Sequence, residues 1–384
     1  MARVRSDAFG RELNPELAMR ISGGRPWEAV PDDLFVIDGV AHTYHYGEDN
    51  WVPGGYGKMA SDGVWGIHKY FSPEGEKWLL PESEHAMQTA DLLAHSLFAE
   101  SDIDACVYHA LPLFPIFRDG GGPIETGKEM RDRWPGRVAL YAAISPYRPD
   151  ALEAIDQLIE EDKVTAFKFY PTDLVDGKVR GVRLDDEELM FPLYERMLKH
   201  GLTTVAMHKA IPFTPQAHEF FGMNDILGAT TSFPALNFEI FHGGFAFLED
   251  TVMKASYAPN MTINLEGSSA LILRAPERLA HILGALMQAG AADRIVWGTG
   301  VPVVHPQPFL EAFWNFQIPD SLQEGYGYDP ITDEAKRMML GGTQARIAGL
   351  DVAAMAAEAS GDEFDRMNGL STPWSKARQV VSHE

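Results

Sequence analysis

The sequence predicts a (β/α)8 barrel from its length, its alternation of segment types and the residues at its strand ends. The chain has 384 residues, which is normal for such a barrel with insertions. Short β-rich runs alternate with helical patterns along most of its length. Several of these runs end on a histidine, and in a parallel barrel the ends of the strands form the functional rim. No G-x-G-x-x-G follows a strand, which argues against a dinucleotide-binding fold.

The predicted strands and helices alternate in the order that a barrel requires. Eight strands are expected, at residues 34–38, 103–111, 137–145, 165–170, 203–208, 238–242, 261–266 and 294–297. Helices are expected at residues 84–100, 149–161, 185–200, 247–257, 276–290, 332–340 and 344–356. Acidic residues begin helix 185–200 and Gly201 ends it, and both are favourable at those termini.

We divide the chain into an N-terminal extension, a barrel and a C-terminal tail. Residues 1–33 are polar and contain one predicted short helix, Pro15–Ile21. The barrel spans residues 34–360, and the polar tail spans residues 361–384. Within the barrel, residues 43–83 form an insertion after the first strand that is rich in Gly, Trp and Tyr. A loop this long is usually a lid, a binding surface or a subunit interface, and the alternative is a surface excursion packed by its own aromatic residues.

The composition indicates a protein that binds neither nucleic acid nor membranes. No apolar run approaches the ~18–20 residues that span a bilayer. The formal net charge is -23, which repels phosphate backbones. The chain begins without an apolar signal segment, and its one cysteine, Cys106, cannot form an internal disulfide. We therefore expect a cytoplasmic protein.

Histidines at three strand ends predict a metal site. The stretch Phe238–Phe245 is a buried strand that stops on His242 and turns on two glycines, which let the backbone approach a bound group closely. A second predicted strand ends on His208, and His42 follows the first strand closely. Imidazole is the commonest metal ligand, and it suits Zn or, together with oxygen ligands, Fe.

Three further residues are candidates for catalytic roles. Lys168 lies between aromatic residues on a central strand, where an unpaired ammonium is costly, so it needs a carboxylate, a ligand or a chemical modification. Glu266 ends the seventh strand and is placed to bind metal, to act as a base or to pair with Lys168. His305 follows the eighth strand near the same rim. A Ser-His-Asp mechanism is not indicated, because the segment after Glu266 lacks the G-x-S-x-G frame.

These stretches resemble the amidohydrolase superfamily, specifically its amidohydrolase-related branch of metal-dependent hydrolases and decarboxylases. The resemblance extends over residues 34–350. Phe233–Gly244 is similar to the family's strand-six motif and is the most specific match. Ala166–Pro171 looks like the strand-four lysine segment, and Arg294–Pro302 looks like the strand-eight segment. The resemblance implies a barrel with its metal at the C-terminal ends of the strands.

Two departures from the family pattern reduce the implied metal site. The strand-one motif of the family is H-x-H or a variant with aspartate first, and here Val40 stands in the first place and His42 in the second. The strand-eight aspartate, which binds metal and handles the proton of the nucleophilic water, is replaced by Gly300. The resemblance therefore implies one metal rather than two, held by His42, His208 and His242, with Zn favoured and Mn or Fe as alternatives.

The loss of the strand-eight base leaves several interpretations. The altered ligand set is similar to that of the zinc-bearing amidohydrolase-fold subunit of 2-aminoisobutyrate hydroxylase, whose paralogous partner subunit carries the oxygen-activating site. This resemblance implies a monooxygenase subunit in a hetero-oligomer that acts on a small amino acid. Aromatic residues of the insertion would then form the subunit interface: Tyr44, Tyr46, Trp51, Tyr56 and Trp65.

The alternative is a free-standing metal-dependent hydrolase or decarboxylase of a small carboxylic acid or amide. A hydrolase without the strand-eight base loses a contribution of ~10²–10⁴-fold in rate unless another group replaces it. Glu266 and His305 are the two candidates for that replacement. A non-catalytic barrel with a purely structural metal is the third interpretation.

Overall fold

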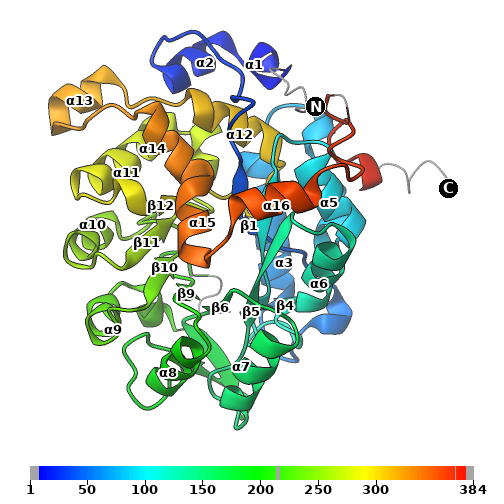
Figure 1. Cartoon of the computed structure of the whole chain (residues 1–384), viewed down its shortest axis with the longest axis vertical. Helices are drawn as coiled ribbons and strands as arrows, with labels where there is room; N and C mark the ends of the chain where they lie inside the picture. The colour runs from blue at the N-terminus through cyan, green and yellow to red at the C-terminus, as the bar shows by residue number, and fades with distance from the viewer. Residues whose placement is uncertain (1–7, 213–216, 368, 378–384) are drawn as a thin grey trace.

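Eight parallel strands form the centre of the molecule and helices surround them, which confirms the predicted (β/α)8 barrel (Figure 1). The computed structural model describes residues 8–212, 217–367 and 369–377. In sheet order the strands are β1 (Ile37–Ala41), β2 (Ala105–His109), β5 (Val138–Ala143), β6 (Ala166–Phe169), β9 (Thr204–Met207), β10 (Asn237–Ile240), β11 (Met261–Asn264) and β12 (Ile295–Val296).

Backbone hydrogen bonds join the first and last strands and bring the barrel close to closure. The amide of Gly39 donates to the carbonyl of Trp297 over 3.1 Å, and the amide of Gly300 donates to the carbonyl of Val40 over 3.0 Å. The buried carboxylate of Asp38 accepts hydrogen bonds from the amides of Val40 and Thr299, both over 3.0 Å. Asp38 therefore holds the ends of β1 and β12 together beneath the rim.

Sixteen α-helices are present in the described part of the chain, most of them packed around the outside of the barrel. They are α1 (Ala8–Glu12), α2 (Pro15–Ser22), α3 (Gly57–Phe71), α4 (Glu82–Ala86), α5 (Ala90–Phe98), α6 (Ile124–Arg133), α7 (Ala151–Glu160), α8 (Phe191–Lys199), α9 (Ile226–Ser232), α10 (Leu248–Tyr257), α11 (Pro276–Gln288), α12 (Pro306–Asn315), α13 (Asp320–Tyr326), α14 (Asp333–Arg337), α15 (Thr343–Ala348) and α16 (Val352–Ala359). None of the helices in this part of the chain is long and apolar enough to cross a membrane.

Several sequence-based boundaries differ from the structure, and local hydrogen bonds explain two of the differences. The first strand was expected at residues 34–38 and is observed at Ile37–Ala41. It therefore ends later than expected, and His42 follows it directly. Helix 185–200 begins only at α8, because the Asp186 side chain accepts from the amides of Glu188 and Leu189 and forms a turn instead. Helix 84–100 is split into α4 and α5, and the Thr89 side chain caps the start of the second.

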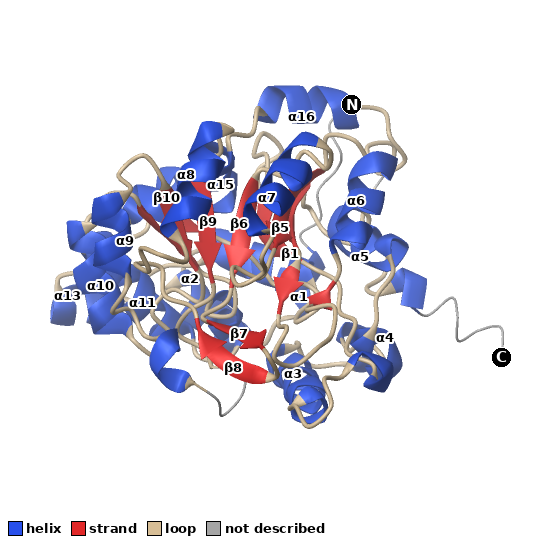
Figure 2. Ribbon diagram, turned by 90° about the horizontal axis from the view of Figure 1, so that it is seen from below, coloured by secondary structure: helices blue, strands red, loops and turns tan. Residues whose placement is uncertain are grey.

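The insertion at residues 43–83 is largely ordered by α3, where the sequence indicated only a loop. Its buried positions Ala60, Val64 and His68 recur every fourth residue, but three glycines within Gly57–Phe71 obscure the helical pattern. A two-stranded hairpin, β7 (Thr172–Val175) with β8 (Lys178–Gly181), follows β6. Figure 2 shows this hairpin and α3 at the same end of the barrel. A second small hairpin pairs β3 (Leu111–Pro112) with β4 (Gly121–Gly122).

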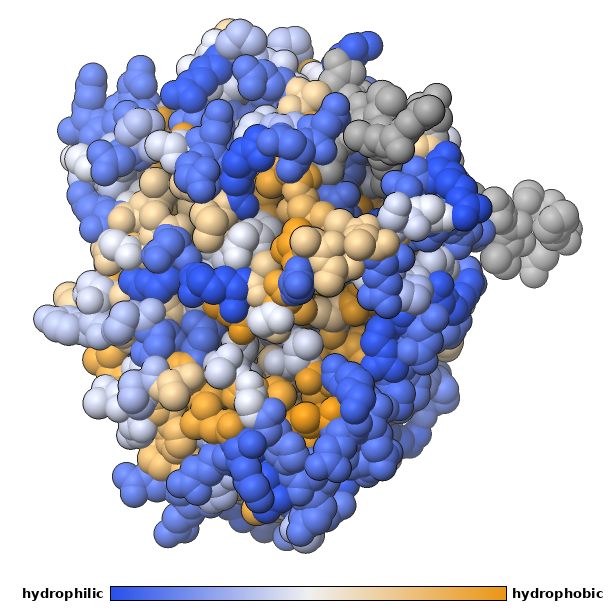
Figure 3. All heavy atoms as spheres, in the orientation of Figure 1, coloured by the Kyte–Doolittle hydropathy of each residue, from blue (hydrophilic) through white to orange (hydrophobic). Residues whose placement is uncertain are grey.

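Polar residues cover most of the face seen in Figure 3, and apolar residues are exposed mainly toward its centre.

The N-terminal extension contains two helices, α1 and α2, rather than the single one expected. The Glu311 carboxylate of α12 accepts from the amides of Phe9 and Gly10, which anchors α1 to the barrel.

Candidate active site

Five of the six predicted site residues line one cavity at the ends of the barrel strands. The cavity has a volume of about 230 Å³ and is lined by His42, Lys168, His208, His242 and Glu266. All five side chains are buried. They follow or belong to β1, β6, β9, β10 and β11. The parallel arrangement of the strands therefore places them at one rim, as the sequence predicted.

His208 and His242 point one ring nitrogen each at a common position. His208 Nδ1 and His242 Nε2 are 3.0 Å apart. The remaining nitrogens face groups that only accept hydrogen bonds. His208 Nε2 lies 2.6 Å from the carbonyl of Ile211, and His242 Nδ1 lies 2.9 Å from the carbonyl and 3.0 Å from the carboxylate of Glu266. Both of these nitrogens must therefore carry hydrogen and donate.

This tautomer assignment leaves two lone pairs facing each other over 3.0 Å. Such an arrangement requires a cation between the two nitrogens, either a proton or a metal ion. Two Zn–N bonds of about 2.05 Å at a tetrahedral angle separate their nitrogens by ~3.3 Å, which is close to the observed distance. Metal-bound histidines commonly donate their other N–H to a carbonyl or carboxylate, as both rings do here. The donor set thus fits one metal ion.

The backbone of His242 is in the left-handed region, with φ of 61°. This conformation costs a non-glycine residue about 1–3 kcal/mol and is found most often at functional sites. The two following glycines continue the turn with φ of 21° and 83°. The Ser268 hydroxyl donates to the His242 carbonyl over 3.0 Å and fixes the turn. The strand therefore ends in a strained turn that aims the imidazole into the cavity.

His42 lines the same cavity but does not complete a three-ligand cluster. Its ring packs against Tyr44, and its buried Nδ1 has no hydrogen-bond partner among the described residues. Burial, assisted by the charge of Lys168, lowers the pKa of His42 to about 3, so the ring is neutral and has a lone pair to offer. Within the described parts of the chain, no three His, Cys, Asp or Glu side chains are close enough to hold a metal as they stand.

The Glu266 carboxylate fills space that Gly300 leaves open. A Cβ added to Gly300 would lie only 2.5 Å from Glu266 Oε1. Burial raises the pKa of Glu266, but the neighbouring His242 and Lys168 outweigh burial and bring it to about 2. The Glu266 carboxylate, just after β11, is therefore ionised and lies where a side chain at Gly300, after β12, would otherwise be.

Lys168 reaches the cavity from β6. Its Nζ lies 4.1 Å from the ring centroid of Phe241 and 5.9 Å from that of Tyr170. Burial lowers the pKa of the Lys168 amine to about 8, although the charges of Glu266 and Glu239 oppose this shift. The Lys168–Glu266 ion pair considered from the sequence is absent, and Glu266 contacts His242 instead.

His305 lies outside this cavity. Its side chain is fully buried against Trp78 and Trp374, and its Nε2 lies 3.1 Å from the Glu100 carboxylate. The Glu100 carboxylate also accepts hydrogen bonds from the backbone amide and the hydroxyl of Ser375. His305 therefore helps to pack the C-terminal segment against the barrel and does not face the cavity.

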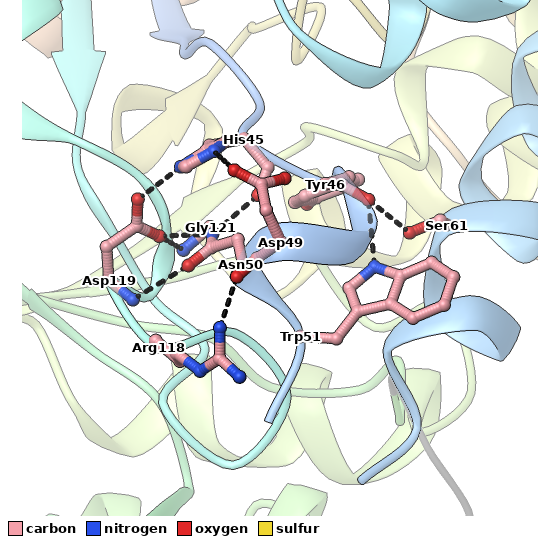
Figure 4. Close-up of polar contacts among 9 residues, drawn as sticks. All are labelled: His45, Tyr46, Asp49, Asn50, Trp51, Ser61, Arg118, Asp119 and Gly121. Atoms are coloured by element: carbon pink, nitrogen blue, oxygen red, sulfur yellow. Dashed lines mark hydrogen bonds and ion pairs between the residues drawn. The ribbon is translucent and has the colours of Figure 1, made fainter. Parts of the chain in front are cut away.

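The insertion forms a roof over the cavity. Tyr44 and Tyr46 stack with ring centroids 4.2 Å apart and line the cavity, so they are buried within this chain. Figure 4 shows how the roof is attached. His45 Nδ1 lies 2.6 Å from the Asp119 carboxylate, and the Asn50 side-chain amide donates to the same carboxylate over 2.6 Å. A hetero-oligomer remains a prediction, but these two tyrosines are not free to form its interface.

Tyr170 and Ile211 are site residues that sequence reasoning missed. The Tyr170 ring stacks on His208 with centroids 4.3 Å apart, and the Ile211 carbonyl orients the same imidazole. Tyr170 is two residues after Lys168 and directly follows β6, and this spacing is a signal for a shared face. The role of Ile211 depends on a loop carbonyl, which the sequence does not reveal.

Comparisons with known proteins point to one family. A family model described as Amidohydrolase matches residues 127–350, more than half of the chain. An uncharacterized TIM-barrel protein from Bordetella bronchiseptica is 17% identical with a TM-score of 0.56, and the match covers 84% of this chain and 100% of that one. A 5-carboxyvanillate decarboxylase from Sphingomonas paucimobilis is 13% identical with a TM-score of 0.51, covering 83% and 100%. At these identities the two structures show the fold alone. No curated protein matches the sequence.

Proposed function

Because the chain belongs to the amidohydrolase family, we propose that it is a free-standing, metal-dependent hydrolase or decarboxylase of a small carboxylic acid or amide. The observation that carries this proposal is the position of Glu266, whose carboxylate occupies the space beside Gly300 and contacts His242. The resemblance of the sequence implied a proton-handling carboxylate on the eighth strand. Here a carboxylate from the seventh strand supplies that group.

His208 and His242 would hold the metal, with His42 as the third protein ligand. Two observations support this assignment. The lone pairs of His208 and His242 face each other, and the buried Nδ1 of the neutral His42 ring has no hydrogen-bond partner among the described residues. A divalent ion bound there would polarise a substrate carbonyl and lower the pKa of water. Histidine ligands favour Zn, with Mn or Fe as alternatives.

Glu266 is the residue that handles the proton in this proposal. Hydrolysis adds water to the carbonyl carbon, transfers a water proton to the carboxylate and returns it to the leaving group as the acyl bond breaks. The charges of His242 and Lys168 keep the Glu266 carboxylate ionised at neutral pH, which is the state that a proton acceptor needs. Decarboxylation instead requires a proton to be delivered to carbon. The ionised carboxylate therefore favours hydrolysis over decarboxylation.

The hydroxylase-subunit interpretation has less support than this one. The family match and the two solved structures do not point to a hydroxylase. Tyr44 and Tyr46, which were expected at a subunit interface, lie in the roof of the cavity. The hetero-oligomer with a paralogous barrel stays a prediction.

The proposal is tested on the full chain purified alone and loaded with Zn or Mn. Elemental analysis should find one metal per chain, and a panel of small amides, esters and carboxylic acids should include a substrate that is turned over. Glu266→Gln should abolish turnover and retain the metal. A chain that binds no stoichiometric metal would refute the proposal. Turnover that appears only after a second barrel protein is added would favour the subunit interpretation.

A further inference from the structure

Asn264 joins the two segments that carry His242 and Glu266. It is the last residue of β11 and is fully buried. Its Oδ1 accepts a hydrogen bond from the backbone amide of Glu266 over 2.9 Å, and its backbone carbonyl accepts one from the amide of Gly243 over 3.1 Å. One residue therefore contacts both the segment with the proton-handling carboxylate and the turn that follows His242.

Glu239 sets the direction of the Asn264 side-chain amide. Asn264 Nδ2 donates to Glu239 Oε1 over 2.6 Å, across the paired strands β10 and β11. The backbone amide of Glu266 only donates, so the atom of Asn264 that faces it must be the oxygen. The reversed side-chain amide would bring two N–H groups together at Glu266 and would turn the Asn264 oxygen toward the Glu239 carboxylate. Glu239 therefore selects the orientation that holds Glu266.

Glu266 contacts His242 through both its backbone and its side chain. His242 Nδ1 lies 2.9 Å from the Glu266 carbonyl and 3.0 Å from the Glu266 carboxylate. A displacement of the Glu266 backbone would therefore change both contacts at once. Neither Glu239 nor Asn264 lines the cavity, so neither touches a bound substrate directly.

From these contacts we infer that Asn264 is a positioning residue for the proposed reaction: Glu239 orients its amide, and the amide holds Glu266 in place against His242. The inference rests on the proposed function and adds to it the two buried residues that fix the carboxylate. A misplacement of about 1 Å can lower a rate by ~10²-fold. Asn264→Ala should therefore lower kcat by up to about 10²-fold, while KM and metal content stay close to those of the unaltered chain.

A spectroscopic test reads the placement of Glu266 without measuring activity. The full chain carries isotope-labelled histidine, and NMR with and without Zn detects the Nδ1–H of His242, which is identified by its absence in His242→Asn. Asn264→Ala should shift this signal, because Glu266 moves. Asn237→Ala is the matched control, since Asn237 accepts from the Thr262 hydroxyl over 2.7 Å between the same two strands. It should lower thermal stability and leave the signal and kcat unchanged.

Two substitutions at Glu239 apply the same test without altering Asn264. Glu239→Gln keeps an oxygen that can accept from Asn264 Nδ2, so the His242 signal should stay near its original position. Glu239→Leu fills a similar space without an acceptor, and it should shift the signal as Asn264→Ala does. Equal signals in these two variants would overturn the orienting role of Glu239.

Three further outcomes would overturn the inference. An unshifted His242 signal in Asn264→Ala would show that the amide does not hold Glu266. An equal shift in Asn237→Ala would indicate a general loosening of the two strands. A shifted signal with unchanged kcat would show that the reaction does not depend on this placement. An unaltered chain without turnover would refute the proposed function alone, and the signal would still show whether Asn264 holds Glu266 against His242.

Discussion

The carboxylate of Glu266 occupies the space that a side chain at Gly300 would need. The distance of 2.5 Å between Glu266 Oε1 and an added Cβ is shorter than any normal contact. The two residues follow β11 and β12, which are neighbours in the barrel. The absence of a side chain at Gly300, after β12, thus leaves the room that the charged group of Glu266, after β11, occupies.

Gly300→Ala should displace Glu266 and impair activity at least tenfold. Gly300 has φ of 65°, so alanine also introduces backbone strain of about 1–3 kcal/mol. Gly349→Ala is the matched control, because Gly349 has φ of 64° and an added Cβ would meet nothing within 4 Å. Both variants should lose stability through backbone strain in thermal unfolding, and only Gly300→Ala should lose activity. Equal activity in the two variants would contradict the coupling.

Glu266→Gln should lower kcat by about 10²–10⁴-fold, because the amide cannot accept the proton. The shape of the side chain is kept, so the metal content should stay close to that of the unaltered chain. Glu277→Gln, at an exposed position of α11 that pairs with Arg20, serves as the control and should have full activity. Unchanged kcat in Glu266→Gln would remove this residue from the mechanism.

His208→Ala removes a direct metal ligand. It should therefore weaken metal binding by more than the 10–100-fold that is typical when a residue that only orients a ligand is lost. Elemental analysis after dialysis measures the effect. His281→Ala changes a histidine of α11 whose Nδ1 lies 2.8 Å from the hydroxyl of Tyr328. His281 is not among the residues that line the cavity, so this variant should keep the metal. Full metal retention in His208→Ala would contradict the assignment of His208 and His242 as ligands.

The sequence was sufficient to predict the barrel and to place five of the six candidate site residues at one rim. Apolar runs that end on His208 and His242 indicate both a strand and the rim where it ends, and the parallel topology brings the ends together. The relation between Glu266 and Gly300 was out of reach, because it depends on the packing of two neighbouring strands. The sequence named both residues but did not indicate that one fills the space of the other.

The placement of His305 shows a second limit of sequence reasoning. A position just after a strand indicates proximity to the rim, but the direction of the side chain depends on the loop. Here the loop leads into α12 at Pro306, and His305 points toward Glu100 and Trp374. The tail was expected to be polar, yet it contributes Trp374, whose side chain is fully buried.

The contact between Glu100 and the C-terminal segment predicts acid-sensitive stability. The Glu100 carboxylate accepts from the amide of Trp374 over 2.7 Å, from Ser375 over 2.9 Å and from His305 over 3.1 Å. Burial opposes its ionisation, but the hydrogen bonds with His305 and Ser375 outweigh burial and lower the pKa of Glu100 below its ordinary value. A lowered carboxyl pKa stabilises the folded state fully above the unfolded pKa of about 4.3.

That stability is lost as pH falls from about 4.3 through the lower pKa of the folded state, because the unfolded chain then binds the proton first. Glu100→Gln should therefore destabilise the protein by roughly 1–3 kcal/mol at pH 7, as a buried charged hydrogen-bond acceptor is lost. The difference in the free energy of unfolding between Glu100→Gln and the unaltered chain should be smaller at pH 3.5 than at pH 7. Urea unfolding at the two pH values, followed by tryptophan fluorescence, measures both effects. A difference between the two chains that does not change with pH would show that Glu100 is not ionised in the folded protein.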